Sequence, residues 1–92
     1  MLPPPDGATA RVVVVSRQGC HLCEQAEDLV RARCPDQWQR LDVDDDPALK
    51  AAYTDHVPVV WVDGKLLAYW TLGAEQLDNA LAGGEWPPPP PL

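Results

Sequence analysis

The sequence lacks phenylalanine, is poor in basic residues and has only three cysteines among its 92 residues. Seven Lys and Arg stand against 14 Asp and Glu, and the resulting net charge of −7 argues against binding to nucleic-acid phosphates or to anionic membranes. An odd number of cysteines does not suit a secreted disulfide framework. The chain has no run of about 18 apolar residues, and it opens with neither the basic nor the apolar stretch of a secretory signal. We therefore expect a cytoplasmic protein that binds neither nucleic acid nor membrane.

The prolines divide the chain into a foldable centre and two ends. Eight of the 11 prolines lie near the termini, so we expect a flexible arm over residues 1–10, one folded domain over residues 11–82 and a Pro-rich tail over residues 83–92. Apolar residues make up 46% of the chain, with Trp and Tyr as its aromatic bulk, which is enough for a modest core. The final proline run favours polyproline II, which either binds an SH3-type groove or stays without a partner.

A run of four valines, Val12–Val15, opens the folded part. Because these apolar residues do not alternate with polar ones, they predict a strand over about residues 11–16 that is buried on both faces. After a glycine turn, apolar residues recur with helical spacing at Leu22, Ala26, Leu29 and Val30. We therefore expect a helix over about residues 20–34, which stops before Pro35 because a residue preceding proline is pushed out of the α region.

Two cysteines, Cys20 and Cys23, lie at the predicted start of this helix. The first helical turn has unpaired N–H groups and a partial positive charge that stabilise a thiolate, so Cys20 is the expected nucleophile and Cys23 lies one turn on. In a chain with this strand–helix pattern, Cys-x-x-Cys predicts a thiol–disulfide redox site. A zinc site is the alternative, but two cysteines fill only half of it and Cys34 would lie about 16 Å beyond Cys23 along the helix. We expect no metal within one chain; an iron–sulfur cluster bridging two chains stays open.

Turn and cap signals define the remaining elements. Asp46 followed by Pro47 predicts a helix start, with the acids before them as a cap and solvated loop rather than a hard-cation site. Asp63-Gly64 is a strong hairpin signal. The predicted elements are a strand over about 37–43, a helix over 47–54, a strand over 56–62, a strand over 65–70 and a helix over 74–82. The order is β-α-β-α-β-β-α.

This order, with Cys-x-x-Cys after the first strand and Val-Pro opening the third, resembles the thioredoxin fold and, within it, the small glutaredoxin-like proteins. Ser16–Cys23 looks like their active-site loop, Leu41–Pro47 like the exit from their second strand, and Val57–Gly64 like their cis-proline loop and hairpin. The resemblance implies an α/β protein with a four-stranded mixed sheet flanked by helices.

The resemblance also implies a thiol–disulfide oxidoreductase. Cys20 would attack a disulfide, and Cys23 would resolve the mixed disulfide into a redox-active disulfide. Pro58 would form a cis peptide facing the cysteines and leave the backbone of Val57 free for substrate. The partner would be a disulfide-containing protein or a glutathione mixed disulfide, with glutathione as the candidate co-substrate, no other cofactor and a monomeric chain. A single Gly73 stands where many glutathione-using members have two small residues.

Several residues near the cysteines keep two interpretations. Arg17 would attract a glutathione carboxylate or stabilise the thiolate, or it is a solvated loop residue. An imidazolium at His21 would favour the thiolate of Cys20, or His21 is a solvent-facing residue. Cys34 is predicted as a buried thiol at the helix end. Three aromatic residues are expected in strand packing, one of which would wall the groove beside the active site: Trp61, Tyr69 and Trp70.

Two other functional classes remain as rivals. A soft-metal chaperone of the ferredoxin-like class also sets Cys-x-x-Cys between a strand and a helix, but its order is β-α-β-β-α-β, whereas here Pro47 starts a helix between the second and third strands. The second rival is a non-catalytic thioredoxin-fold module whose Pro-rich tail recruits a partner.

Overall fold

The computed structural model describes residues 5, 7–87 and 89 of the chain, and it has the predicted order of elements with one short 3₁₀ helix added. The elements are β1 (Val12–Ser16), α1 (His21–Arg33), β2 (Trp38–Asp42), η1 (Val43–Asp45), α2 (Pro47–Tyr53), β3 (Val59–Val62), β4 (Lys65–Tyr69) and α3 (Ala74–Leu81). The four strands form one mixed sheet in the order β2-β1-β3-β4, with β1 parallel to β2 and antiparallel to β3. The predicted α/β architecture of a thioredoxin fold is confirmed.

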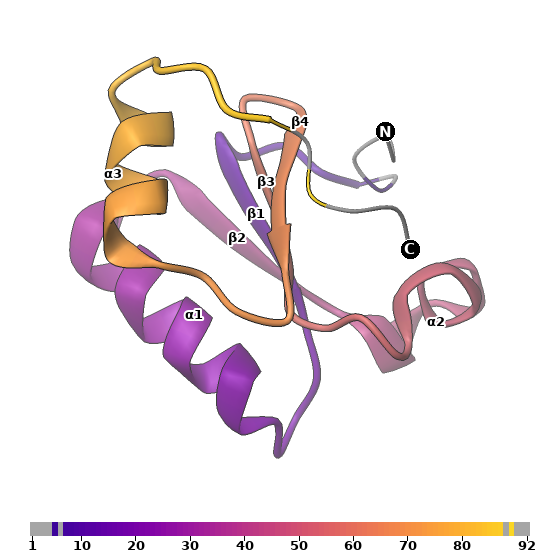
Figure 1. The fold of residues 1–92 in the computed structure, drawn as a ribbon. Helices are drawn as coiled ribbons and strands as arrows, with labels where there is room; N and C mark the ends of the chain where they lie inside the picture. The colour runs from indigo at the N-terminus through magenta and orange to yellow at the C-terminus, as the bar shows by residue number, and fades with distance from the viewer. Residues whose placement is uncertain (1–4, 6, 88, 90–92) are drawn as a thin grey trace.

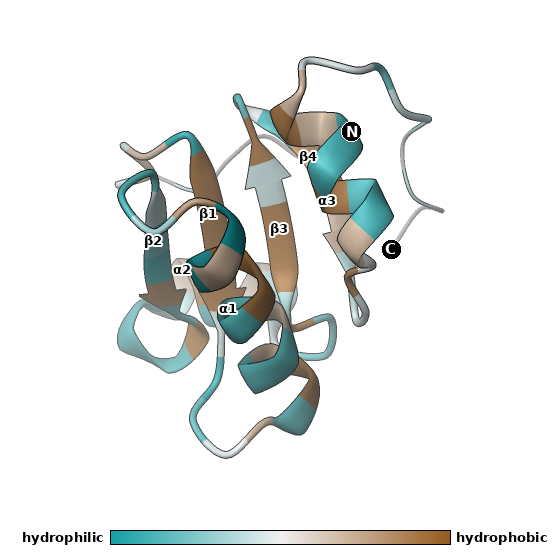
Figure 2. Ribbon diagram, turned by 90° about the vertical axis from the view of Figure 1, so that its left-hand side faces the viewer, coloured by the Kyte–Doolittle hydropathy of each residue, from teal (hydrophilic) through white to brown (hydrophobic). Residues whose placement is uncertain are grey.

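Strand β1 lies at the centre of this architecture. Its four valines are at most 2% exposed, as the unbroken apolar run predicts. Helices α1 and α3 cover one face of the sheet and α2 lies on the other (Figure 1). Val12 and Val14 pack on the α1–α3 side with Leu77, and Val13 and Val15 pack on the α2 side. In Figure 2, β1 and β3 are mainly hydrophobic, whereas β2 is largely hydrophilic and the helices contain residues of both kinds.

Helix α1 shows one error of the periodicity argument. The helix begins after Cys20 and ends at Arg33, close to the predicted ends. However, Leu22 is 39% exposed, and the buried stripe is formed by Cys23, Ala26 and Val30. Because one residue turns the helix by about 100°, a stripe that contains Cys23 leaves Leu22 outside the buried face.

The predicted second and third strands are too long at their ends. Val43 was expected in a strand but starts η1, because the Asp42 carboxylate accepts the backbone N–H of Asp44 at 2.8 Å and turns the chain. Strand β3 begins at Val59 rather than residue 56, since Pro58 has no N–H to donate to the ladder.

Helix α2 and the hairpin agree with their local signals. Asp46 caps α2 by accepting the N–H of Ala48 at 2.8 Å, and Pro47 occupies the first turn. Asp63 and Gly64 connect β3 to β4 with φ values of 53° and 80°, the left-handed pair of a two-residue hairpin. Trp70, in contrast, lies beyond β4 with φ 71° and is 48% exposed, so its predicted packing within the strand is wrong.

The two ends of the chain lie partly outside the described residues. The expected flexible arm includes residues 1–4 and 6, and the expected polyproline II tail includes residues 88 and 90–92, none of which the structure describes. Within the described part, Gln39 accepts the N–H of Thr9 at 2.9 Å and donates to the carbonyl of Gly7 at 3.0 Å. The indole of Trp86 donates to the carbonyl of Leu66 on the edge strand β4 at 2.9 Å. Across these described residues, no helix is both long enough and apolar enough to cross a membrane.

Candidate functional site

The Cys-x-x-Cys loop joins the end of β1 to the start of α1. Gly19 has φ 79°, a left-handed conformation that glycine adopts without steric cost, and it turns the chain toward the helix. The N–H of Cys20 then donates to the carbonyl of Arg17 at 3.4 Å. Cys20 becomes the N-cap of α1, and its sulfur accepts the backbone N–H of Cys23 at 3.2 Å. The loop therefore places the first sulfur where an unpaired helical N–H stabilises negative charge.

The two thiols differ in their accessibility. Both are free, with Cys20 partly exposed and Cys23 at 0% exposure. Burial and the hydrogen bond with Cys20 raise the pKa of Cys23 from 9.0 to about 11, against smaller lowering effects from Ser16 and the backbone of Arg17. Cys20 is therefore the thiol that solvent can reach, and Cys23 lies inside the protein.

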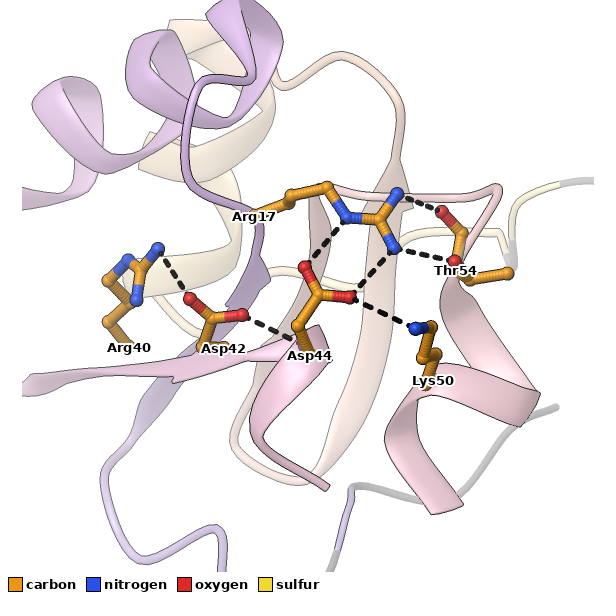
Figure 3. A network of polar contacts seen from close by, with 6 residues as sticks. All are labelled: Arg17, Arg40, Asp42, Asp44, Lys50 and Thr54. Carbon is orange, nitrogen blue, oxygen red and sulfur yellow. Dashed lines mark hydrogen bonds and ion pairs between the residues drawn. The ribbon is translucent and has the colours of Figure 1, made fainter. Parts of the chain in front are cut away.

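Arg17 is held by a network that reaches across to η1 and α2 (Figure 3). Its guanidinium forms two hydrogen bonds with the Asp44 carboxylate, at 3.1 and 3.2 Å. It also donates to the carbonyl and hydroxyl oxygens of Thr54 at 3.0 and 2.6 Å. Lys50 lies 4.0 Å from the same carboxylate. This hydrogen bonding raises the pKa of Arg17 and lowers that of Asp44.

This network corrects one of the sequence-based interpretations of Arg17. The side chain is not a solvated loop residue, since four hydrogen bonds hold it. Meanwhile its main chain contacts both cysteines, through the carbonyl that accepts from Cys20 and the backbone hydrogen bond to Cys23. Arg17 thus fixes the loop by its side chain and the thiols by its backbone.

The sheet register brings the Val-Pro segment beside this loop. Val59 pairs with Val15, so Val57 and Pro58 lie next to the end of β1, where the Cys-x-x-Cys loop starts. The Val57–Pro58 peptide bond is cis, and the carbonyl of Pro58 accepts the backbone N–H of Trp70 at 2.9 Å.

Three rings form a cluster at the same end of the sheet: His56, Tyr69 and Trp70. The indole of Trp70 stacks on His56 with ring centres 5.6 Å apart, and Tyr69 meets both rings edge-on. The indole N–H donates to the carbonyl of Asp55 at 3.0 Å, which holds the ring in place while 48% of the residue stays exposed. Trp70 is therefore the aromatic residue available to line a groove beside Pro58, whereas Trp61 is fully buried.

The other candidate residues from the sequence, His21 and Cys34, take no part in the contacts described above. The His21 side chain is 95% exposed, with its Nδ1 3.8 Å from Glu24. Cys34 is a buried thiol at the far end of α1, where its S–H donates to the carbonyl of Val30 at 3.3 Å. Among the residues that the structure describes, no group of three or more His, Cys, Asp or Glu side chains could hold a metal ion.

Four polar residues around the Cys-x-x-Cys loop were not predicted as part of the site. Asp44 and Thr54 were assigned only to a cap and a helix end, and Ser16 and Glu27 were given no role. Ser16 is fully buried, and its hydroxyl donates to Glu27 at 2.7 Å. One signal was present, because Glu27 follows Cys23 by four residues and so shares its helix face.

Comparison with known proteins gives a consistent result. A family model described as glutaredoxin-like domain (DUF836) matches residues 11–82. An uncharacterised protein of Mycobacterium tuberculosis is 28% identical over 88 residues, with 87% of this chain and 91% of that protein covered. The crystal structure of a structural-genomics target protein from X. campestris has a TM-score of 0.67 and 33% identity, covering 80% of this chain and 99% of that one. Glutaredoxin C1 from Populus tremula x tremuloides, at 21% identity and a TM-score of 0.51 over 80% of this chain and 76% of that one, shares the fold.

Proposed function

This chain belongs to the glutaredoxin-like domain family, and we propose that it is a thiol–disulfide oxidoreductase acting through Cys20 and Cys23. One observation carries the proposal: the partly exposed sulfur of Cys20 caps α1 and accepts the backbone N–H of Cys23 at 3.2 Å, and the thiol of Cys23 is itself fully buried. This arrangement supports two separate roles, with Cys20 as the attacking sulfur and Cys23 as the resolving sulfur. A second thiolate must displace the mixed disulfide that the first attack leaves, and Cys23 is placed to supply it.

The reaction proceeds in two displacements. The thiolate of Cys20 attacks one sulfur of a disulfide R–S–S–R′, forms Cys20–S–S–R and releases R′–S⁻, which takes up a proton. The thiolate of Cys23 then attacks the sulfur of Cys20, forms the Cys20–Cys23 disulfide and releases R–S⁻, which is protonated in turn. The substrate disulfide is reduced by two electrons and the protein dithiol is oxidised by two, so no other cofactor is needed.

The surroundings of the cysteines support a bound substrate at the end of the sheet where β1 leads into the Cys-x-x-Cys loop. In our proposal the backbone of Val57 and the ring of Pro58 line the groove, with Trp70 as its aromatic wall. His21 is exposed at the helix start and is open to contact by a partner. We give Arg17 a positioning role in place of glutathione binding, because Asp44 and Thr54 already occupy its guanidinium.

The partner and setting are part of the proposal. We propose that the substrate is a disulfide-containing protein or a glutathione mixed disulfide, with glutathione as co-substrate, and that the chain acts as a monomer in the cytoplasm. The acidic composition, with a net charge of −7, disfavours nucleic acid as a partner.

The experiment compares three cysteine variants on a glutathionylated peptide and on a protein disulfide. Cys20→Ser should abolish exchange with both substrates. Cys23→Ser should accumulate a mixed disulfide on Cys20 that mass analysis of peptides can locate. Cys34→Ser is the matched control and should keep the wild-type rate. Exchange that survives Cys20→Ser, or a mixed disulfide located on Cys34, would overturn the proposal.

A further inference from the structure

The outer edge of strand β4 is a surface that the proposed function does not use. β4 stands last in the strand order β2-β1-β3-β4, so among the described residues no further strand pairs with this edge. The strand itself is apolar, since Leu66, Leu67, Ala68 and Tyr69 are at most 6% exposed. An apolar strand with an uncovered edge is a template for pairing with a second chain.

Groups from outside the sheet hydrogen-bond to the backbone of this edge. The indole N–H of Trp86 donates to the carbonyl of Leu66 at 2.9 Å. Further along the strand, the backbone N–H of Thr71 donates to the carbonyl of Tyr69 at 2.9 Å. An added strand would use outward-pointing carbonyls of this kind as its acceptors. The indole of Trp86 therefore occupies a position that an added strand would need.

The segment that carries Trp86 is fixed at two places. Lys65 of β4 donates from Nζ to the carbonyl of Trp86 at 3.1 Å, and its charge lies 4.7 Å from the centre of the indole ring. Asn79 of α3 donates its side-chain amide to the carbonyl of Glu85 at 3.3 Å, and its own carbonyl accepts the N–H of Gly84 at 2.9 Å. The chain thus crosses from α3 to β4 and is held at both (Figure 1).

The prolines after Trp86 continue beside the same strand. Pro87 and Pro89 line a hollow of about 410 Å³ together with Leu67, Ala68 and Tyr69. Proline has no backbone N–H, so a proline segment beside a strand cannot extend the ladder or offer a regular new edge to another strand. The Pro-rich composition of this segment therefore suits a covering role and does not suit a fifth strand.

We propose that residues 85–87, which we call the edge cover, keep a second copy of this chain from pairing with β4. Two copies of β4 related by a twofold axis would pair antiparallel, each presenting the same surface to the other. In a pairing centred on Leu67, the two Lys65 charges would lie at opposite ends, so they would not oppose it. This inference goes beyond the proposed function, because it involves neither Cys20 nor Cys23.

The test measures the mass of the full chain in solution by light scattering, with the cysteines kept reduced. The wild type should have the mass of one chain. Trp86→Ala removes the indole from the carbonyl of Leu66 and should shift the mass to that of two chains at high protein concentration. Because five-residue strands bury less area than a standard interface, we expect a weak dimer with a dissociation constant of about 10⁻⁴ M.

Hydrogen exchange locates the new interface. The backbone N–H of Leu66 points to the same edge as its carbonyl, so in the Trp86→Ala dimer it should exchange several times more slowly than in the diluted variant. The matched control is Trp38→Ala, which removes an indole packed on the same core cluster but belonging to β2, at the opposite edge of the sheet. It should remain monomeric at every concentration.

A second variant protects the test against loss of folding. Lys65→Ala removes both contacts of Lys65 with Trp86 and leaves the indole and the core in place, so it should also dimerise, but more weakly. Circular dichroism checks that each variant is folded, and Lys65→Ala alone decides if Trp86→Ala does not fold.

Three results would overturn the edge cover. The first is a folded variant that stays monomeric at the highest concentration. The second is a dimer, or a larger species, in which exchange of the Leu66 amide is not slowed. The third is association of Trp38→Ala to the same extent as Trp86→Ala. Because the cysteines stay reduced throughout, each of these results leaves the proposed function untouched.

Discussion

The two ends of strand β1 carry similar residues and differ in what these residues hold. Each end has an arginine paired with an aspartate: Arg17 with Asp44 at 3.1 Å beside the cysteines, and Arg11 with Asp63 at 3.0 Å beside the hairpin. Both arginine side chains are 32% exposed. The ion pair alone therefore does not distinguish the cysteine end of β1 from the hairpin end.

The two ends differ in how the arginine relates to the buried cysteine near it. At the hairpin end, Arg11 donates to the carbonyl of Leu81 at 2.6 Å, and its charge slightly lowers the pKa of Cys34, which burial raises more. Cys34 has a carbonyl as its hydrogen-bond partner and lies far from the other thiols in α1. At the cysteine end, the main chain of Arg17 contacts Cys20 and Cys23. We therefore attribute the proposed reactivity to the paired sulfurs and to the loop that holds them.

Replacing each arginine by alanine should give the largest difference in exchange rate between the two ends of β1. Arg17→Ala frees the loop that positions both sulfurs, and because small misplacements of reacting groups are costly, we expect disulfide exchange to slow by about tenfold or more. Arg11→Ala should leave the exchange rate unchanged. The rates are measured with the same glutathionylated peptide, and an equal loss in both variants would show that Arg17 acts only through general stability.

Two glycines, one at each end of β1, allow the two ends to be compared in their backbone conformation. Gly19 before Cys20 and Gly64 in the hairpin have φ values of 79° and 80°, and a Cβ at either position would meet no atom within 4 Å. Replacing each by alanine should therefore cost only the left-handed conformation, about 1–2 kcal/mol of unfolding free energy at both sites. Denaturant unfolding measures this cost. Only Gly19→Ala should also slow exchange, and a slower rate in Gly64→Ala would contradict the distinction between the two ends.

Two tryptophans, Trp70 and Trp86, test the substrate groove. Trp70→Ala removes the ring beside Pro58, and an aromatic contact of about 0.5–1.5 kcal/mol corresponds to a rise in KM of about two- to tenfold for a peptide disulfide. The matched variant Trp86→Ala removes an indole from the edge of β4, away from the cysteines. It should lower the melting temperature and leave KM unchanged; a KM that is insensitive to Trp70→Ala removes Trp70 from the groove.

The smallest effect concerns stability at alkaline pH. Folded Cys23 keeps its proton up to about pH 11, whereas the unfolded thiol loses it near 9.0, so its stabilising contribution is complete below pH 9 and is lost as the pH rises toward 11. Cys34 and Tyr53 also have raised pKa values and act in the same direction. In Cys23→Ala, under reducing conditions, the fall in melting temperature between pH 9 and 11 should be smaller by a few degrees. An unchanged fall would mean that the pKa of Cys23 is not raised.

The sequence predicted the fold well where the signals were local. The valine run, the Asp46-Pro47 helix start and the Asp63-Gly64 hairpin each depend on neighbouring residues, and the structure has all three. Errors occurred where tertiary packing decides the outcome. Leu22 fits a helical period but is 39% exposed, and Trp70 follows a strand pattern but lies beyond the strand with a positive φ.

The residues of the candidate site likewise include some that the sequence predicts and some that it does not. Cys20 and Cys23 could be proposed from spacing alone, and Pro58 from its resemblance to a known loop. The Arg17–Asp44 contact joins residues 27 positions apart, and no local pattern indicates it. Contacts of this kind depend on how η1 and α2 pack beside the loop, which periodicity does not describe.

A redox titration tests the central claim most directly. The purified, chelator-treated chain is equilibrated in glutathione buffers of varied ratio, free thiols are trapped by alkylation, and peptides are identified by mass. We expect a reversible disulfide between Cys20 and Cys23, with Cys34 alkylated as a free thiol after unfolding at every ratio. If no Cys20–Cys23 disulfide forms at any ratio, or if Cys34 is the residue that is oxidised, the dithiol mechanism is wrong.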